Sequence, residues 1–302
     1  MGEIKKYTDV VRLGHRSTYG VLSEGDFITI TEKIDGSNAS FKLNENNGVD
    51  GFSRNGPVDN VNSLRGYYEW LKENIKPELL NPRFRYFGEW LVPHHVQYKQ
   101  EYYHKFYLFN VYDDELEEYL SDEVMRDEAL QLGIDTVPLL FEGRYESYEQ
   151  LVGYIGQSDM ALKHGEGIVV KNVGYRDKYG HQCFVKLVHE EFTEVQKQRP
   201  PRDPNRPVTP EQEFAVMCVT KARVGKLLHK LVDEGIIEAD FSIEDMRVIL
   251  KNLGNRVYED ILKEESDSLP VAYEMQVLRK AIGSKIPQIV KEILKDNDTM
   301  VA

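Results

Sequence analysis

Hydrophobic residues in the first two thirds of the chain form short runs that are typical of β-strands. Seven segments rich in β-branched and aromatic residues are predicted strands: 27–31, 39–43, 51–54, 85–92, 105–112, 167–171 and 182–188. Apolar residues at helical spacing predict three helices: 61–75, 116–132 and 148–155. Strands mixed with helices of unequal length indicate an α+β fold for this part of the chain.

The hydrophobic period changes in the last third of the chain. Apolar residues recur every 3.6 positions in five segments: 214–232, 243–253, 257–263, 271–282 and 286–294. This pattern predicts a small all-α domain of four or five helices. Segment 198–210 contains five prolines in 13 residues, which favours a stiff, extended linker. We therefore predict a front domain over 1–198, a Pro-rich linker over 199–210 and a helical C-terminal domain over 211–302.

Composition adds limits on the class of protein. Of the 302 residues, 41% are hydrophobic and 29% are charged, which is usual for a globular protein. No apolar run has the length of about 20 residues that a membrane helix needs. The two cysteines, Cys183 and Cys218, exclude a disulfide framework and a Cys-rich zinc site. We expect a cytoplasmic, monomeric protein with no membrane segment.

The net charge of −13 argues against binding of nucleic acid by overall charge, although an acidic protein can carry a local basic surface. Three basic residues of the back domain, Arg223, Lys226 and Lys230, fall on one helical face if the segment is a helix. This face is a candidate for contact with RNA phosphates. The alternative is an ordinary solvated helix surface.

The segment Thr31 to Asn38 carries the strongest chemical signal. Lys33 ends a predicted strand, and Asp35 and Gly36 follow it at once, where glycine allows a tight turn and close approach of a ligand. A lysine with its reference pKa of about 10.4 is a poor nucleophile at neutral pH. Burial and neighbouring cations lower that pKa, and Lys171 and Lys186 in later predicted strands can supply such cations.

An ordered set of short motifs follows Lys33 along the chain. The set comprises Lys33-Ile34-Asp35-Gly36, Ser53-Arg54, Gly88-Glu89, the aromatic run 105–112, Glu166-Gly167-Ile168-Val169-Val170-Lys171, and Lys186. Over roughly residues 25–190 the chain resembles the covalent nucleotidyltransferases, which include ATP-dependent DNA ligases, RNA ligases and mRNA capping enzymes. It is most similar to the RNA ligase 2-like branch, because Glu32 precedes the lysine, Ser37-Asn38 follows the glycine, and no β-barrel module is predicted at the C-terminus.

The resemblance implies a nucleotidyltransferase domain with ATP-grasp-like antiparallel sheets, and an ATP-dependent RNA ligase. Lys33 would attack the α-phosphate of ATP and hold AMP covalently. Glu166 would bind Mg²⁺, for which Mn²⁺ can substitute, and Lys171 and Lys186 would neutralise phosphate charge in the transition state. The partner would be RNA with 5′-phosphate and 3′-hydroxyl ends.

The resemblance also implies a set of nucleotide-binding residues. Arg54 would contact the ribose or the RNA 5′-phosphate, Glu89 the ribose hydroxyls and Phe109 the adenine. The same pocket would contain Glu32, Ile34 and Asn38. Two of these residues have a structural alternative, since Glu89 could be a buried paired carboxylate and Phe109 an ordinary core aromatic.

One motif is incomplete. The last motif of the family often reads Lys-x-Lys, whereas only Lys186 is present here. Either Lys171 compensates, or another cation does, such as His181 or Lys178. Two alternatives to an RNA ligase stay open. The first is a DNA ligase or capping-type enzyme, against which Ser37-Asn38 and the lack of a predicted β-barrel module argue. The second is a non-catalytic nucleotide- or nucleic-acid-binding relative, which only the incomplete motif favours. A zinc site is not expected, because His94, His95 and His104 match no zinc-binding spacing.

Overall fold

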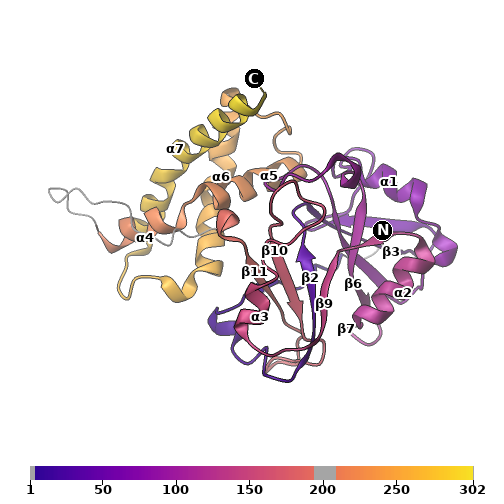
Figure 1. Cartoon of the computed structure of the whole chain (residues 1–302). Coiled ribbons are helices and arrows are strands. Elements are labelled where there is room, and N and C mark those ends of the chain that lie inside the picture. Colours follow the sequence, from indigo (N-terminus) through magenta and orange to yellow (C-terminus); the bar gives the residue numbers. More distant parts are fainter. Residues whose placement is uncertain (1–3, 194–208, 302) are drawn as a thin grey trace. The chain divides into compact units, whose positions relative to one another are not determined.

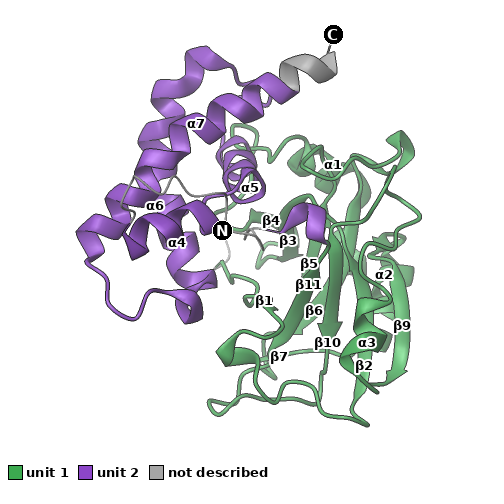
Figure 2. Ribbon diagram, turned by 60° about the vertical axis from the view of Figure 1, so that its left-hand side comes forward, with its two compact units in different colours: residues 1–189 green, residues 190–302 purple. Residues whose placement is uncertain are grey.

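The computed structural model describes residues 4–193 and 209–301 (Figure 1). The chain divides into two compact units, residues 1–189 and residues 190–302 (Figure 2). Most of the predicted linker, 199–210, lies outside the described residues. Its last two residues, Thr209 and Pro210, cap and begin a helix, because Thr209 accepts a hydrogen bond from the backbone of Gln212 and proline is well suited to the first helical position.

The first sheet of unit 1, here sheet A, has five strands in the order β1-β11-β10-β2-β9. Their bounds are Val11–Arg12, Phe184–Val188, Gly167–Lys171, Phe27–Lys33 and Leu139–Arg144. β1 pairs in parallel with β11, whereas the other neighbours are antiparallel. Segments from both ends of unit 1 thus lie side by side in this sheet.

The second sheet, sheet B, has the order β4-β3-β5-β6-β7, and β8 pairs in parallel with β6. In sequence order, β3 to β8 span Ser37–Leu43, Val49–Ser53, Phe84–Trp90, Phe106–Asp113, Glu118–Tyr119 and Asp135–Thr136. A bulge lies between β5 and β6, where Phe87 pairs with Asn110 but Gly88 pairs with Leu108, so Phe109 is the extra residue.

Helices cover the outer faces of the two sheets. On sheet B, α1 (Tyr67–Asn74) and α2 (Asp122–Leu132) pack on the face that carries Phe41, Trp90 and Leu108 (Figure 1). On sheet A, α3 (Tyr148–Val152) contributes Leu151 to a core built on alternate strand residues. The inner faces of the sheets meet in an aromatic cluster of Tyr7, Phe87, Tyr112, Tyr119 and Phe184. Unit 1 is therefore two sheets with their inner faces together and helices outside.

Unit 2 is helical. Its four long helices are α4 (Pro210–Cys218), α5 (Lys221–Asp233), α6 (Met246–Glu264) and α7 (Met275–Val301), and they enclose one apolar core. The predicted segment 214–232 is two helices, because Thr220 caps a new helix through the backbone of Arg223.

Short 3-10 helices occur in both units: Arg16–Thr18, Pro77–Leu79, Gln100–Tyr102, Glu190–Phe192, Ile243–Asp245 and Ser266–Ser268. The predicted α+β fold with a helical C-terminal part is confirmed.

The three helices predicted in unit 1 are all shorter than expected, and α3 ends at Val152 rather than at residue 155. Leu64, Arg65 and Gly66 have positive φ angles, so α1 begins only at Tyr67 rather than near residue 61. The segment before α2 contributes β7 instead of a helical turn. The sequence also does not predict β1, β8 or β9, because β1 and β8 have only two residues each and β9 lacks a clear alternating pattern.

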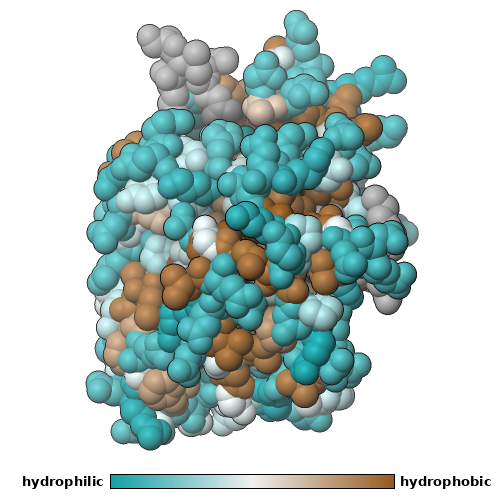
Figure 3. Space-filling model, turned by 90° about the vertical axis from the view of Figure 1, so that its right-hand side faces the viewer, coloured by the Kyte–Doolittle hydropathy of each residue, from teal (hydrophilic) through white to brown (hydrophobic). Residues whose placement is uncertain are grey.

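The surface drawn in Figure 3 carries hydrophobic residues in separate groups among hydrophilic ones, which is ordinary for a protein surface. Over the described ranges 4–193 and 209–301, none of the helices combines the length and the apolar character needed to cross a bilayer.

Candidate active site

Strand register brings Lys33 onto the inner face of sheet A. Lys33 of β2 pairs with Gly167 of β10. Two residues away on the same strand face, Thr31 pairs with Val169. Val169 also pairs with Lys186 of β11, on its other side. Side chains of directly paired residues lie on the same face of a sheet. Lys33, Val169 and Lys186 therefore face sheet B together.

Carboxylates surround the Lys33 amine. Lys33 Nζ donates a hydrogen bond to the Glu166 carboxylate in an ion pair. Burial alone would lower the pKa of Lys33, but the negative charges of Glu166, Asp35 and Glu89 outweigh burial and raise it. The expectation that neighbouring cations lower this pKa is wrong for the protein without its substrate, because the nearest charges are carboxylates.

The turn after Lys33 is held by Asp35. Its backbone N–H donates to the Tyr98 hydroxyl at 2.8 Å, and its carboxylate accepts from the N–H groups of His95 and Val96 at 2.8 and 3.0 Å. Burial would raise the pKa of Asp35, but the bond from His94 and nearby positive charge hold it well below its usual value. The carboxylate is thus kept ionised as a fixed anchor of the turn.

Gly36 is required by close packing. A Cβ atom at this position would lie 2.6 Å from the Trp90 carbonyl oxygen, well inside contact distance. The Gly36 N–H donates to the Glu89 carboxylate at 3.1 Å. The turn from β2 to β3 therefore places Lys33 and Glu89 near each other, because it lies directly on β5.

Glu89 and Asn38 pair across strands β5 and β3 and share the inner face of sheet B. Burial raises the pKa of the Glu89 carboxyl to about 8, and the charges of Lys33 and His94 only partly oppose this effect. A half-buried carboxyl of this kind can accept hydrogen bonds from sugar hydroxyls once it is ionised.

The β6 bulge carries Phe109. Its ring is half-buried and lies 4.8 Å from the ring of Tyr7, edge to face. The Tyr7 hydroxyl donates to the Asn110 side chain at 2.7 Å. Val169, on the inner face of sheet A, packs against the same aromatic cluster as Phe109. An aromatic and an aliphatic side chain thus line the region between the sheets, next to the position of Lys33 on its strand.

Lys171 is placed differently from the expectation. Its side chain is 1% exposed, and Nζ donates to the Phe109 carbonyl and to the Asp122 carboxylate, the latter at 2.7 Å. Lys33 pairs with Gly167, four residues earlier on β10, so Lys171 lies about 13 Å further along the strand. The structure assigns Lys171 a buried ion pair that ties β10 to α2, not a place beside the Lys33 amine.

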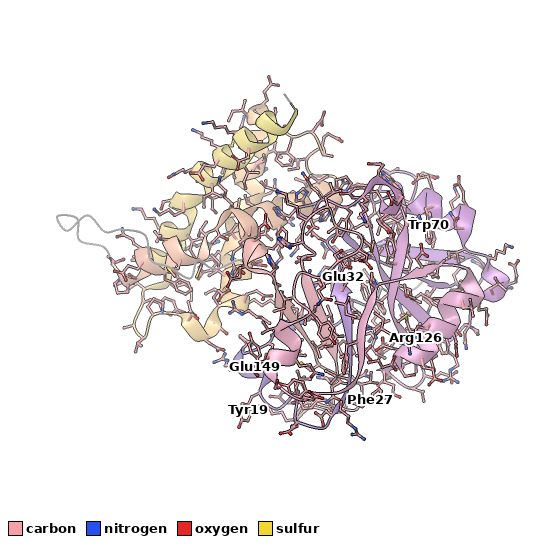
Figure 4. All side chains as sticks on the ribbon, in the orientation of Figure 1. Tyr19, Phe27, Glu32, Trp70, Arg126 and Glu149 are labelled. Carbon is pink, nitrogen blue, oxygen red and sulfur yellow. The ribbon has the colours of Figure 1, made fainter. Side chains whose placement is uncertain are left out.

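Three further nucleotide-binding candidates are scattered. Arg54 Nη2 donates to Asp9 at 2.8 Å on the surface. Ile34 is buried in the turn. Glu32 lies at the end of β2 in the interior of unit 1 (Figure 4), on the strand face opposite to Lys33. The Glu32 carboxylate is therefore not among the side chains that surround the Lys33 amine.

Glu32 has an unusual environment. It is 1% exposed, and among the described residues neither carboxylate oxygen has a hydrogen-bond partner. Burial raises the pKa of Glu32 to about 7, Asp159 adds to the rise, and the nearby Ser158 hydroxyl opposes it.

The RNA face predicted on α5 is wrong for Arg223. Its side chain is fully buried and bonds to Asp260 at 2.6 Å and to Glu265 at 2.7 Å. Lys226 also approaches Asp260, at 3.4 Å, and Lys230 is half-buried. The helical spacing was correct, but this face of α5 turns toward the interior of unit 2, where arginine needs paired carboxylates.

His94 was not expected in the site. Its side chain is 7% exposed, with Nδ1 lying 3.5 Å from Asp35 and Nε2 lying 3.4 Å from the Ser37 hydroxyl. The histidine spacing carries no recognisable signal, because His94 reaches the site through a loop more than 50 residues after Lys33.

The donor set suits one kind of metal. Across residues 4–193 and 209–301 there is no group of three or more His, Cys, Asp or Glu side chains that could hold an ion by themselves. Mg²⁺ is commonly bound by one or two carboxylates together with substrate phosphates. Glu166, half-buried beside Lys33, fits such a ligand, whereas a closed protein metal site is not formed by the described residues.

Comparison with solved structures shows what kind of fold this is. A mutant of an RNA ligase of Naegleria gruberi in its apo form matches with a TM-score of 0.50 and 21% identity, over 63% of this chain and 57% of the ligase. A second mutant of that ligase, with ATP and Mn, gives a TM-score of 0.49 at 21% identity, over 63% and 57%. The first match indicates that the chain shares the fold of an RNA ligase. The chain spans 57% of the length of that ligase.

The family is shown by the sequence itself. The family model described as RNA ligase matches residues 26–188, more than half of the 302 residues. The chain belongs to the RNA ligase family. No curated protein matches the chain.

Proposed function

We propose that this protein is an ATP-dependent RNA ligase that joins RNA 3′-hydroxyl and 5′-phosphate ends. The observation that carries the proposal is the placement of Lys33 at the end of β2, among Glu166, Glu89 and Asp35, between the inner faces of two sheets. Membership of the RNA ligase family supports it.

The chemistry takes place in three transfers. In the first, Lys33 Nζ forms a P–N bond to the α-phosphate of ATP, and the P–O bond to pyrophosphate breaks. In the second, AMP passes from Lys33 to the RNA 5′-phosphate, which gives a 5′–5′ anhydride. In the third, the RNA 3′-hydroxyl attacks that phosphate, a phosphodiester forms and AMP leaves. Holding the reacting ends together supplies much of the rate.

Lys33 must lose a proton before it attacks. Its ion pair with Glu166 raises the pKa and keeps the amine protonated while the site holds no nucleotide. When Glu166 exchanges Lys33 for another positive partner, the pKa of Lys33 falls, since burial alone lowers it. Glu166 would hold Mg²⁺, or Mn²⁺ in its place, and the ion would supply charge neutralisation for the phosphates.

The nucleotide would bind along the inner faces. Glu89 would accept hydrogen bonds from the ribose hydroxyls, and Asn38 lies beside it on the same face. The adenine would stack on Phe109, opposite Val169, because these two side chains approach from the two sheets. Lys186, whose charge acts on Glu166, would bind a phosphate.

The direct test is covalent labelling. Incubation with ATP labelled at the α-phosphate and Mg²⁺ should label the protein, and Lys33→Ala should abolish the label. Lys163→Ala, at an exposed lysine outside the site, is the matched control and should label normally. Label that survives Lys33→Ala would contradict the proposed role of this lysine.

The substrate is tested by sealing assays. A panel of nicked RNA duplexes, nicked DNA duplexes and single-stranded RNA, each with a 5′-phosphate, should show joining of RNA in preference to DNA. Preference for nicked DNA would favour a DNA ligase. Binding of ATP without any protein labelling, seen as thermal stabilisation alone, would favour a non-catalytic relative.

A further inference from the structure

The two-residue strand β1 brings an arginine next to Lys186. β1 pairs in parallel with β11, with Arg12 opposite Lys186, and the Leu13 N–H donates to the Lys186 carbonyl at 3.0 Å (Figure 2). Neighbouring strands lie about 4.8 Å apart, so the two long side chains start from adjacent positions. Arg12 and Lys186 are 174 residues apart in sequence, so no local motif contains both.

The flanking residues show which face Arg12 occupies. Val10 packs against the aromatic cluster between the sheets, whereas Leu13 packs against the core on the outer face of sheet A. Because side chains alternate along a strand, Arg12 points to the same side as Val10, which is the inner face. Its register partner Lys186 lies on that face as well, and Arg12 is half-buried there.

The other candidates for a second cation lie elsewhere. Lys171 is buried in its ion pair with Asp122. His181 is 78% exposed and lies with Lys178 in a surface turn around Asp177. Among these candidates, none stands beside Lys186 on its sheet, whereas Arg12 does so through backbone pairing.

We propose that Arg12 is the second cation of the last motif, and that together with Lys186 it binds the phosphates of ATP during formation of Lys33–AMP. This inference rests on the proposed function and adds a residue to the same site. The carboxyl groups of Glu166, Asp35 and Glu89 surround Lys33, and the charge of Lys186 acts on Glu166, so a triphosphate bound at Lys33 needs cations on the adjoining strand. The planar guanidinium can hold two phosphate oxygens at once, which suits it to this role.

Two variants and a matched control test the inference. Arg12→Ala should lower kcat/KM for adenylylation about 10- to 100-fold, the usual cost of losing a hydrogen bond to a charged group. Arg12→Lys should recover part of this loss. Arg16→Ala, at an exposed arginine four residues away, should behave as wild type. Thermal unfolding of each variant shows whether β1 remains paired.

A binding measurement separates this inference from the proposed function. Calorimetric titration with inorganic pyrophosphate and Mg²⁺ should show at least tenfold weaker binding for Arg12→Ala and no change for Arg16→Ala. Wild-type pyrophosphate binding and labelling in a folded Arg12→Ala protein would overturn the inference. A defect confined to sealing of 5′-phosphate RNA by pre-adenylylated protein would also overturn it, because the ligand would then be the RNA phosphate. Absence of labelling in the wild type, with normal pyrophosphate binding, would instead contradict the ligase function.

Discussion

At the scale of single residues, the site is defined by charge balance. Lys33 is the proposed nucleophile, yet its surroundings favour the protonated amine, because Glu166, Asp35 and Glu89 outweigh the effect of burial on its pKa. The amine of Lys33 is therefore held in its protonated form, which is not nucleophilic. Reactivity depends on what replaces Lys33 as the partner of Glu166, and this can be tested without RNA.

Glu166→Gln should lower the pKa of Lys33, because it removes the nearest negative charge while burial still disfavours the ammonium form. An amine-acylating reagent should then modify Lys33 at lower pH in the variant than in the wild type. Mass spectrometry of the modified peptide over a pH series measures this shift. Lys178, exposed in both proteins, serves as the internal reference. An unchanged profile for Lys33 would show that Glu166 does not control its proton.

Glu32 makes a second prediction, on stability. Its pKa is raised from 4.5 to about 7 in the folded protein, so the folded state binds the proton more tightly than the unfolded chain does. The associated stability is present below about pH 4.5 and is lost as pH rises through about 7. The Glu32→Gln side chain does not ionise, so the variant escapes this loss. Between about pH 4.5 and about pH 8.5, its free energy of unfolding should rise relative to that of the wild type by up to about 3 kcal/mol. Urea unfolding at both pH values measures the difference, and a pH-independent difference would refute it.

At the scale of elements, the turn between β2 and β3 joins the two sheets and follows directly on Lys33, the proposed nucleophile. It is held by the Asp35 carboxylate on the backbone of the loop after β5 and by close packing of Gly36 on Trp90. Strand pairing adds the rest of the site, since Glu89, Val169 and Lys186 come from three other strands. A small change in this turn should therefore affect both folding and chemistry.

Gly36→Ala should destabilise the protein by about 1–3 kcal/mol, because its Cβ would overlap the Trp90 carbonyl and force the strands apart. Adenylylation of the fraction that folds should also fall. Gly56→Ala is the matched control, since a Cβ there would meet no atom within 4 Å. Denaturant unfolding and labelling with ATP measure both effects. Equal stability of the two variants would mean that β5 can shift at Trp90 to accommodate the added Cβ without a cost in stability.

At the scale of the whole molecule, the two units have separate cores. The residues of the helical core all come from unit 2, and the cores around both sheets come from unit 1. The family match and the residues around Lys33 lie in unit 1. Unit 2 contributes a buried ion cluster of Arg223, Asp260 and Glu265 to its own stability.

Arg223→Ala should destabilise unit 2 by about 3–5 kcal/mol, because two carboxylates would lose their buried partner. Lys221→Ala, which removes exposed ion pairs on the same helix, should cost less than about 1 kcal/mol. Both tryptophans, Trp70 and Trp90, lie in unit 1, so their fluorescence reports unit 1 while helical circular dichroism reports mainly unit 2. Arg223→Ala should shift the unfolding transition seen by circular dichroism more than the transition seen by tryptophan fluorescence. Equal shifts would show that the units unfold as one.

The sequence by itself determined the α+β class, the helical C-terminal part and the family, since these depend on local periodicity and on short motifs around Lys33, Glu89 and Glu166. Only the tertiary structure decided which charges meet. Lys171 and Arg223 looked available in sequence but are buried with Asp122, Asp260 and Glu265, whereas Arg12 and His94 carried no signal and lie at the site. The reason is physical: the partner of a charged side chain is set by strand register and helix packing between distant segments, which local pattern does not encode.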